Sequence, residues 1–193
     1  MMQPFYHHAI TVLWLIWGFY WLIASFSTKT TRRRESAASR ASHMIPLIVA
    51  AVLLSNRRIA GPYLSATLLP HTFATFWIGL FFVAFGIAFS IAGRVWLGGN
   101  WSGTVTLKDN HELIRSGPYR LVRHPIYTGI LLAILGTAIA QGEWRSLIAL
   151  VLITVAFLRK IAIEESFLVQ EFGNSYERYR SEVPALIPLL PRM

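Results

Sequence analysis

The sequence predicts an all-α integral membrane protein with about five transmembrane helices, a C-terminal helical hairpin and interfacial helices. Of its 193 residues, 54% are hydrophobic and only 14% are charged. A soluble domain usually carries about 25% charged residues. Apolar runs recur along the chain, and Lys and Arg gather in alternate connections between them. These two patterns together are typical of a multi-pass membrane protein.

Five apolar runs are candidate spans, at residues 9–26, 42–55, 72–92, 126–140 and 146–158. No basic residue precedes the first run and no small-residue cleavage pattern follows it, so we expect a retained helix. The second run is short for a span of about 20 residues. It either extends into residues 40–42 or is partly re-entrant. Residues 141–145 form a tight turn, so the last two runs are expected to pair as a hairpin.

The basic residues predict the orientation of the spans. With five spans, the connections 27–41, 93–125 and 159–193 lie on one side, and they hold fifteen of the eighteen Lys and Arg residues. The positive-inside rule places that side in the cytoplasm, with the N-terminus outside and the C-terminus inside. Residues 166–193 are amphipathic and are expected to lie on the cytoplasmic surface, with an interruption near Gly173. The length fits a single domain.

Composition also excludes several kinds of site. The chain has no cysteine, which excludes disulfides, thiolate metal ligands and cysteine nucleophiles. Its six histidines lack zinc-binding spacing, so no metal site is expected. The net charge of +9 suits membrane topology and anionic headgroups, because no nucleic-acid-binding motif accompanies it. We therefore expect membrane lipids, and no nucleic acid, as partners.

Residues 117–129, Gly-Pro-Tyr-Arg-Leu-Val-Arg-His-Pro-Ile-Tyr-Thr-Gly, open the fourth apolar run. Proline is favoured at the first position of a helix, so Pro125 is expected to begin a helix that His124 caps. The positive end of that helix dipole then faces the membrane surface. Anchoring at the lipid headgroups is the simplest role for such residues. Polar groups at a membrane edge are costly, however, so a binding site is the second interpretation.

A second charged cluster, residues 159–165, follows the fifth apolar run. Lys160 and Glu164 are four residues apart and share one helix face, whereas Glu165 points about 100° away. A surface ion pair is the simple interpretation. Because the two clusters bracket a hairpin, however, they are expected to meet at one membrane face and to form a single site.

These motifs resemble the isoprenylcysteine carboxyl methyltransferases and the wider group of membrane phospholipid and isoprenoid methyltransferases, of which this chain looks like a prokaryotic member. The resemblance covers residues 98–188. It rests on Asn100-Trp101-Ser102, His111-x-Leu113-Ile114, Gly117-x-Tyr119, Arg123-His124-Pro125-x-Tyr127, Glu164-Glu165 and Phe172-Gly173-x-x-Tyr176-x-x-Tyr179. It implies that residues 1–96 are a scaffold and that residues 97–193 form the cofactor-binding catalytic half.

The resemblance implies S-adenosyl-L-methionine as the cofactor, with S-adenosyl-L-homocysteine as its product. The residues matching the cofactor contacts of the family are Thr104, His111, Glu112, Leu113, Ile114, Tyr119, His124, Pro125, Ile126, Tyr127 and Glu164. The implied catalytic residues are Arg123, Lys160 and Glu164, and the implied substrate-binding residues are Arg159 and Lys160. Where the family has an arginine for the substrate carboxylate, this chain has Lys160. A lysine cannot make the two-pronged contact of a guanidinium, and the neighbouring Arg159 is a candidate to compensate.

The leading functional hypothesis from this resemblance is carboxyl O-methylation of a lipophilic, isoprenylcysteine-like acceptor that reaches the site from the bilayer. A second hypothesis is amine N-methylation of a phospholipid. Hypotheses of another class are an NADPH-dependent membrane lipid reductase and a non-enzymatic lipid-binding protein. The absence of an organelle-targeting signal favours a prokaryotic plasma membrane as the location.

Overall fold

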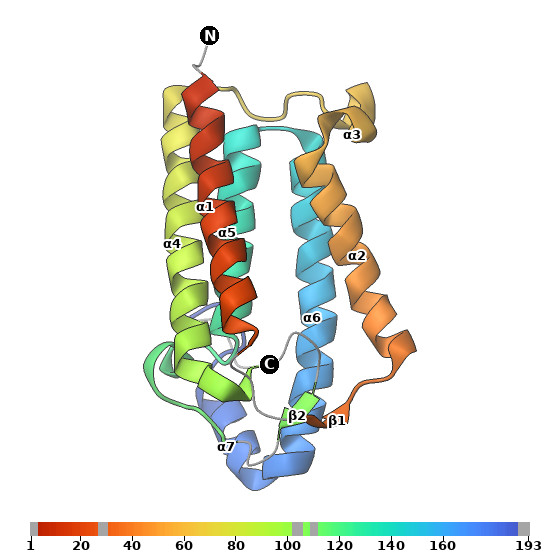
Figure 1. The fold of residues 1–193 in the computed structure, drawn as a ribbon, viewed down its shortest axis with the longest axis vertical. Coiled ribbons are helices and arrows are strands. Elements are labelled where there is room, and N and C mark those ends of the chain that lie inside the picture. Colours follow the sequence, from red (N-terminus) through yellow and green to blue (C-terminus); the bar gives the residue numbers. More distant parts are fainter. Residues whose placement is uncertain (1–3, 27–30, 102–105, 109–111, 189–193) are drawn as a thin grey trace.

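The computed structural model describes residues 4–26, 31–101, 106–108 and 112–188. Within these ranges the chain forms five long helices that run side by side and alternate in direction (Figure 1). They are α1 (Pro4–Ala24), α2 (Ala37–Ser55), α4 (Phe73–Leu97), α5 (Pro125–Gln141) and α6 (Trp144–Phe172). The expected class, an all-α membrane protein, is confirmed.

Three of these helical stretches are long and apolar enough to cross a membrane: Ala37–Ser55, Phe73–Asn100 and Trp144–Phe172. The apolar helices His8–Ala24 and Pro125–Gln141 are shorter. With 29 residues, α6 is about 44 Å long at 1.5 Å per residue. A hydrocarbon core is only about 30 Å thick, so the last turns of α6 extend past its edge.

Short elements lie at the two ends of the bundle (Figure 1). Helix α3 (Arg57–Leu64) lies at one end, and α7 (Asn174–Glu182) lies at the other. Strands β1 (Thr31–Arg34) and β2 (Thr106–Lys108) pair antiparallel at the same end as α7, where β2 contacts α6. Two 3₁₀ turns, Gly98–Asn100 and Gly117–Arg120, complete the described elements. The sequence patterns predicted neither the β1–β2 ribbon nor α3, because each is too short to show a clear periodicity.

Several helix boundaries differ from those expected. Helix α2 starts at Ala37, because the Ser36 side chain caps it by accepting a hydrogen bond from the Ser39 nitrogen at 3.2 Å. The second run is therefore a full helix and takes in residues 40–42. The fifth run continues well beyond residue 158, to Phe172. The helix is interrupted at Gly173, where φ is 50°, as the sequence predicted.

Helices α4 and α5 pack with their backbones in contact. Gly79, Gly86 and Gly93 recur every seven residues on α4, and Gly129 and Gly136 do so on α5. A Cβ atom added at Gly129 would lie 2.5 Å from the Gly86 carbonyl oxygen, and one at Gly79 would lie 2.6 Å from that of Gly136. Small residues at such spacing let membrane helices approach closely. We call this contact the glycine seam.

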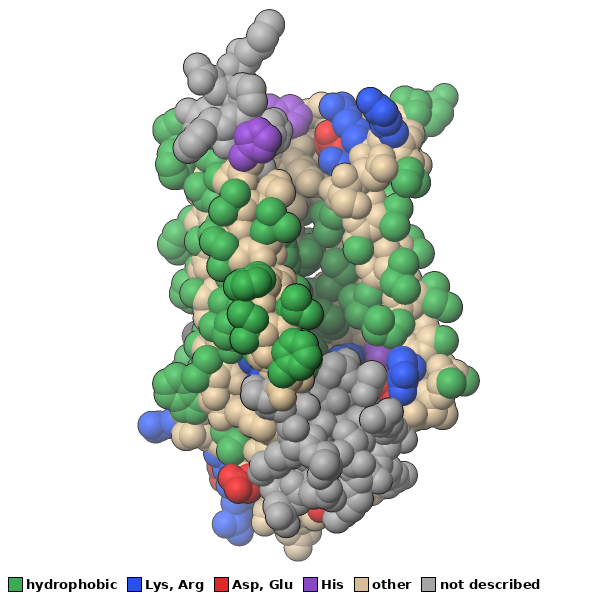
Figure 2. All heavy atoms as spheres, viewed as in Figure 1, with side chains coloured by type: hydrophobic (Ala, Val, Ile, Leu, Met, Phe, Trp, Pro, Cys, Tyr) green, Lys and Arg blue, Asp and Glu red, His purple; other side chains and the backbone are tan. Residues whose placement is uncertain are grey.

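Helix α1 packs on α4, and α2 packs on α6 (Figure 1). The Trp14 indole donates to the Thr137 hydroxyl of α5, and the Trp17 indole donates to the Ser90 hydroxyl of α4, both at 3.0 Å. The space-filling view shows a hollow between α1 and α2 with hydrophobic side chains on its floor (Figure 2). The buried core at this level includes Ile153 and Phe157 of α6. On this face an apolar recess therefore separates α1, α4 and α5 from α2 and α6.

The turn between α5 and α6 is hydrogen-bonded to the connection before α4 and to the end of α2. Gly142 adopts a left-handed conformation, and its carbonyl accepts hydrogen bonds from the Leu68 and Leu69 nitrogens at 2.7 and 3.1 Å. Arg145 is buried, pairs with Glu143, and donates to the Leu54 carbonyl at 2.8 Å. The last carbonyls of α2 are thus satisfied by α6, which holds the two helices together at this end.

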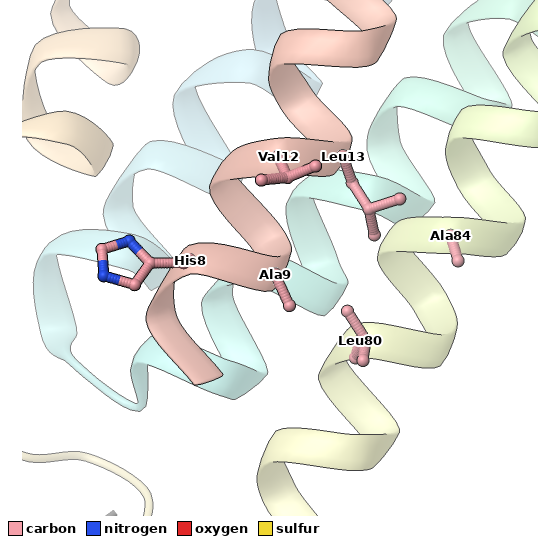
Figure 3. A pocket seen from close by; sticks show the side chains of 6 residues that line it. All are labelled: His8, Ala9, Val12, Leu13, Leu80 and Ala84. Carbon is pink, nitrogen blue, oxygen red and sulfur yellow. The ribbon is translucent and has the colours of Figure 1, made fainter. Parts of the chain in front are cut away.

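A second recess lies between α1 and α4 near the start of α1 (Figure 3). Its volume is about 490 Å³ and its lining is His8, Ala9, Val12, Leu13, Leu80 and Ala84. Apart from the His8 imidazole this lining is apolar, and it lies at the end of the bundle opposite α7 (Figure 1). It therefore suits lipid contact more than chemistry.

Candidate functional site

The start of α5 is shaped as the sequence predicted. Pro125 is the first helical residue and His124 is the N-cap. The backbone nitrogens of Arg123 and His124 donate to the carbonyls of Pro184 and Ala185 at 2.9 and 3.0 Å. The segment after α7 is therefore fastened across the beginning of α5, and it closes the site at this end of the bundle.

Glu165 is the centre of a buried charge cluster. Its Oε1 atom accepts from the Arg123 Nε at 2.9 Å and lies 2.8 Å from the second terminal guanidinium nitrogen of Arg123. The same oxygen lies 3.1 Å from the His124 Nε2. Arg180 of α7 lies 3.4 Å from the other oxygen. Glu165 thus joins α5, α6 and α7 at one point.

Arg123 uses its remaining donors on the backbone. It donates to the Arg180 carbonyl at 3.0 Å and also to the Val183 carbonyl. Its side chain is only 2% exposed. These contacts favour a positioning function for Arg123, and its expected catalytic role stays a prediction.

Glu164, the adjacent carboxylate, faces a different environment. It accepts a hydrogen bond of 2.6 Å from the Tyr127 hydroxyl and lies 3.6 Å from the His124 Nδ1. Its side chain is 22% exposed, against 8% for Glu165. The His124 imidazole therefore lies between the two glutamates, with one ring nitrogen toward each. Of the two carboxylates, Glu164 is the more open to a ligand.

Lys160 is buried one turn before Glu164, and its Nζ lies 5.3 Å from the centre of the Tyr127 ring, a cation–π geometry. Tyr127 also packs on Phe157, with ring centres 4.7 Å apart. Arg159 is exposed and donates to the Ser42 hydroxyl of α2. Only Lys160 of this pair is thus placed at the Tyr127–Glu164 cluster.

Three tyrosines support the site: Tyr176 and Tyr179 of α7, and Tyr119 of the Gly117–Arg120 turn. The buried Tyr179 donates its hydroxyl to the Tyr119 carbonyl at 2.6 Å, and the Tyr119 hydroxyl donates to the Gly93 carbonyl of α4 at 3.3 Å. Burial raises the pKa of both phenols above the ordinary value. Tyr176 is buried as well, and burial together with the nearby Glu165 raises its pKa. The three phenols therefore stay neutral, and those of Tyr119 and Tyr179 act as structural hydrogen-bonding groups.

The other predicted cofactor residues are placed less centrally. Thr104 and His111 lie outside the described residues. Glu112 is exposed, and Leu113 and Ile114 are half-buried in the approach to the Gly117–Arg120 turn. Pro125 and Ile126 are buried against Gly93 of α4. Their expected contacts with a cofactor stay predictions.

Sequence reasoning missed two residues on the α2 side of the site. Glu35 and His43 are buried, and the Glu35 Oε1 lies 3.5 Å from the His43 Nε2. Charged groups near enough to act on His43 also include Arg159, Lys160 and Glu164. Glu35 is the first acidic residue of the chain and the only one before Asp109, and this isolated negative charge could have marked it as a site candidate. The part of the chain that the structure describes contains no group of three His, Cys, Asp or Glu residues that could hold a metal ion.

The fold and the site together define an integral membrane helical bundle with a buried charged cluster where α5, α6 and α7 meet. A family model described as "Phospholipid methyltransferase" matches residues 74–175, more than half of the chain. The chain belongs to this family, and the resemblance to membrane methyltransferases is confirmed.

Individual relatives agree with this assignment. The chain is 38% identical over 113 residues to Protein-S-isoprenylcysteine O-methyltransferase from Schizosaccharomyces pombe, covering 57% of this chain and 48% of that protein. It is 33% identical over 84 residues to Protein-S-isoprenylcysteine O-methyltransferase B from Arabidopsis thaliana, covering 43% of each chain. It is 30% identical over 149 residues to Cobalt-zinc-cadmium resistance protein CzcN from Cupriavidus metallidurans, covering 76% and 61%. The chain thus spans about half the length of the curated relatives it matches.

Proposed function

We propose that this protein is an S-adenosylmethionine-dependent membrane methyltransferase that methylates the carboxylate of a lipophilic, isoprenylcysteine-like acceptor. The observation that carries the proposal is the joining of His124, Tyr127, Lys160 and Glu164 at one end of the bundle. The names of the isoprenylcysteine O-methyltransferase relatives support methyl transfer to isoprenylcysteine as the reaction type.

The residues of the site fit the proposed cofactor. A sulfonium nucleotide carries positive charge on sulfur and on its amino group, and Glu164 is a partly exposed carboxylate held in place by Tyr127. The Tyr127 ring is already in cation–π contact with Lys160, so Tyr127 serves the donor through the hydroxyl that holds Glu164. When bound, the cofactor supplies an electrophilic methyl group.

The chain then has to bind the methyl donor and the acceptor, align them, and exclude water from the site. Glu164 balances the charge of the donor, and Lys160 holds the anionic acceptor next to it. An acceptor carboxylate is already ionised at neutral pH, so its methylation requires no strong general base. Fixing the two reactants in a reactive geometry can supply about 7–11 kcal/mol. Burial of Lys160 and His124 keeps the site dry, which strengthens these electrostatic contacts.

Access follows from the shape of the bundle. The hollow between α1 and α2 is lined by hydrophobic side chains (Figure 2). In the proposed orientation it would open sideways to the bilayer, so a lipophilic or lipidated substrate would approach the buried Lys160 from the side. The cofactor would arrive from the water at the α7 end. In the proposed orientation that end is cytoplasmic, the N-terminus is outside, and the membrane is a prokaryotic plasma membrane.

A second candidate is N-methylation of a phospholipid amine. The description of the matched family favours it, and Glu164 is placed to accept a proton from an amine. Against it, the buried Lys160 repels a cationic ammonium group in its neighbourhood.

Methyl transfer from labelled S-adenosylmethionine in proteoliposomes tests the proposal, with a prenylcysteine analogue and phosphatidylethanolamine offered side by side. We expect transfer to the acid, loss of transfer in Glu164→Gln, and full or increased activity in Lys160→Arg. Transfer to phosphatidylethanolamine alone, with Lys160→Arg inactive, would select the amine reaction. Binding of NADPH without binding of S-adenosylhomocysteine would select the reductase. Binding of neither nucleotide would favour a lipid-binding protein.

A further inference from the structure

The α2 side of the site contains a pair of buried groups that the proposed chemistry has not used. Glu35 precedes α2, and His43 lies two turns into it. We call these two residues the α2 pair. The Glu35 side chain is 1% exposed, and its Oε2 accepts a hydrogen bond from the Ser39 hydroxyl at 2.9 Å. The carboxylate is thereby held against the histidine.

His43 has an unmet hydrogen-bonding capacity. Its side chain is 1% exposed, and neither ring nitrogen makes a hydrogen bond within the described part of the chain. The 3.5 Å approach of Glu35 is an ion-pair contact. Leaving a buried donor or acceptor unsatisfied costs about 1–3 kcal/mol. Such a group at a candidate site is a ready contact for a ligand.

The α2–α6 contact sets the level of His43 in the bundle. The Arg159 side chain donates to the Ser42 hydroxyl, so residues 42 and 43 lie level with residues 159 and 160. The charged groups that act on His43 are Glu35 behind it, and Lys160, Glu164 and Arg159 from α6. In the space-filling view, histidine and basic side chains gather at the lower end of the hollow between α1 and α2 (Figure 2).

The charge balance of this corner favours an anion. Glu164 is matched by the cationic methyl donor under the proposed function. When a protonated His43 pairs with Glu35, the remaining charges of this corner are those of Lys160 and the exposed Arg159. An acceptor carboxylate would meet this positive charge.

We propose that His43, backed by Glu35, joins Lys160 in a two-point site for the acceptor carboxylate. In this complex the imidazole is protonated: one ring N–H faces Glu35, and the other donates to one carboxylate oxygen. The Lys160 ammonium donates to the other oxygen of that carboxylate. A single ammonium is a point charge and cannot orient a carboxylate by itself, whereas two donors from different helices fix its plane. The specificity for a carboxylate is then shared between α2 and α6. This inference rests on the proposed function, because it names the group bound beside the methyl donor.

The test compares His43→Ala with the double variant His43→Ala/Lys160→Arg in proteoliposomes. In His43→Ala the KM for a prenylcysteine acid should rise about 10- to 100-fold, since a hydrogen bond to a charged group is lost. Its kcat, and the Kd for S-adenosylhomocysteine measured by calorimetry, should stay within about twofold. The guanidinium of the double variant offers two donors and should lower the KM again. His43→Gln, which keeps an N–H donor, should lie between wild type and His43→Ala.

The control is His71→Ala, an exposed histidine in the connection between α3 and α4. It should leave KM, kcat and nucleotide affinity unchanged. An unchanged Kd for S-adenosylhomocysteine also shows that His43→Ala is folded.

The outcomes separate this inference from the proposed function. A fall in kcat at constant KM in His43→Ala would assign the imidazole to proton removal and overturn the inference. An unchanged KM, or no recovery in the double variant, would overturn it as well, while methyl transfer by the wild type leaves the proposed function in place. Absence of S-adenosylhomocysteine binding by the wild type would instead overturn the proposed function.

Discussion

Substitution by glutamine is expected to affect different properties at the two adjacent glutamates of α6: stability at Glu165 and ligand affinity at Glu164. Glu165→Gln removes the negative charge at the centre of the buried cluster and keeps the size of the side chain. Arg123 then loses the charge that balances its guanidinium, which is 2% exposed. Glu164→Gln keeps a carbonyl oxygen for the Tyr127 hydroxyl and removes a charge that is open to ligand.

The size of the first effect follows from the contacts. Breaking a buried ion pair by removing one partner costs about 3–5 kcal/mol. The contact with Arg180 adds little, because that side chain is 48% exposed and surface pairs contribute about 0–1 kcal/mol. We therefore expect Glu165→Gln to lose about 3 kcal/mol or more of unfolding free energy. For Glu164→Gln we expect a loss of about 1 kcal/mol or less, because the amide oxygen still accepts from the Tyr127 hydroxyl, more weakly than a carboxylate does.

Thermal unfolding in detergent measures the loss of stability, and calorimetric titration with S-adenosylhomocysteine measures ligand affinity. For a chain of this length, a loss of 3 kcal/mol corresponds to a fall in Tm of about 6–12 °C. Glu165→Gln should melt early, and Glu164→Gln should melt near wild type but bind S-adenosylhomocysteine at least about tenfold more weakly. If Glu164→Gln proved the less stable variant, or if Glu165→Gln melted like wild type, the division of roles between the two carboxylates would be wrong.

Three further predictions follow from other contacts. Gly86→Ala should lower the unfolding free energy by about 1–3 kcal/mol because its Cβ overpacks the glycine seam. Gly18→Ala, whose added Cβ would meet open space in a helix, should leave stability unchanged or raise it by up to about 1 kcal/mol in the same melt. Tyr127→Phe should weaken S-adenosylhomocysteine binding about 3- to 10-fold in calorimetry, since it removes the hydroxyl that holds Glu164 at 2.6 Å, and unchanged affinity would count against the assigned site. The raised pKa of Tyr179 means that its phenol stays neutral above about pH 10, where the unfolded chain ionises, so its contribution to stability is present below that pH and is lost as the pH rises further. Ultraviolet titration checks this, because ionisation of that phenol near pH 10 in the folded protein would contradict the burial.

The parts of the site that local rules govern could be predicted from the sequence. The Arg-His-Pro motif predicted a helix beginning at Pro125 with His124 as its cap. The structure has His124 at the N-cap position, but its side chain makes no capping hydrogen bond and contacts Glu164 and Glu165 instead. The hairpin turn predicted that the start of α5 and the end of α6 would meet, and His124 does lie 3.6 Å from Glu164.

The parts that depend on packing could not. Spacing along a helix placed Glu165 on a face away from Lys160 and Glu164, but nothing in the local pattern shows that Arg123, His124 and Arg180 converge on it. The α2 pair could not be predicted for the same reason, because only the contact of α2 with α6 places His43 near the site. The extension of α6 to Phe172 was missed because charged residues end the apolar run without ending the helix.

The glycine seam also bears on how the protein could move. Where two backbones touch, neither helix can rotate or slide without a collision, so α4 and α5 behave as one wall that carries His124 and Tyr127 at a fixed position. Side chains separate the remaining helices, and rotamer changes let such contacts adjust at low cost. Under the proposed function, the movement that admits a hydrocarbon tail would fall to α1 and α2, and a bilayer that stiffens around those two helices would slow methyl transfer without altering the site.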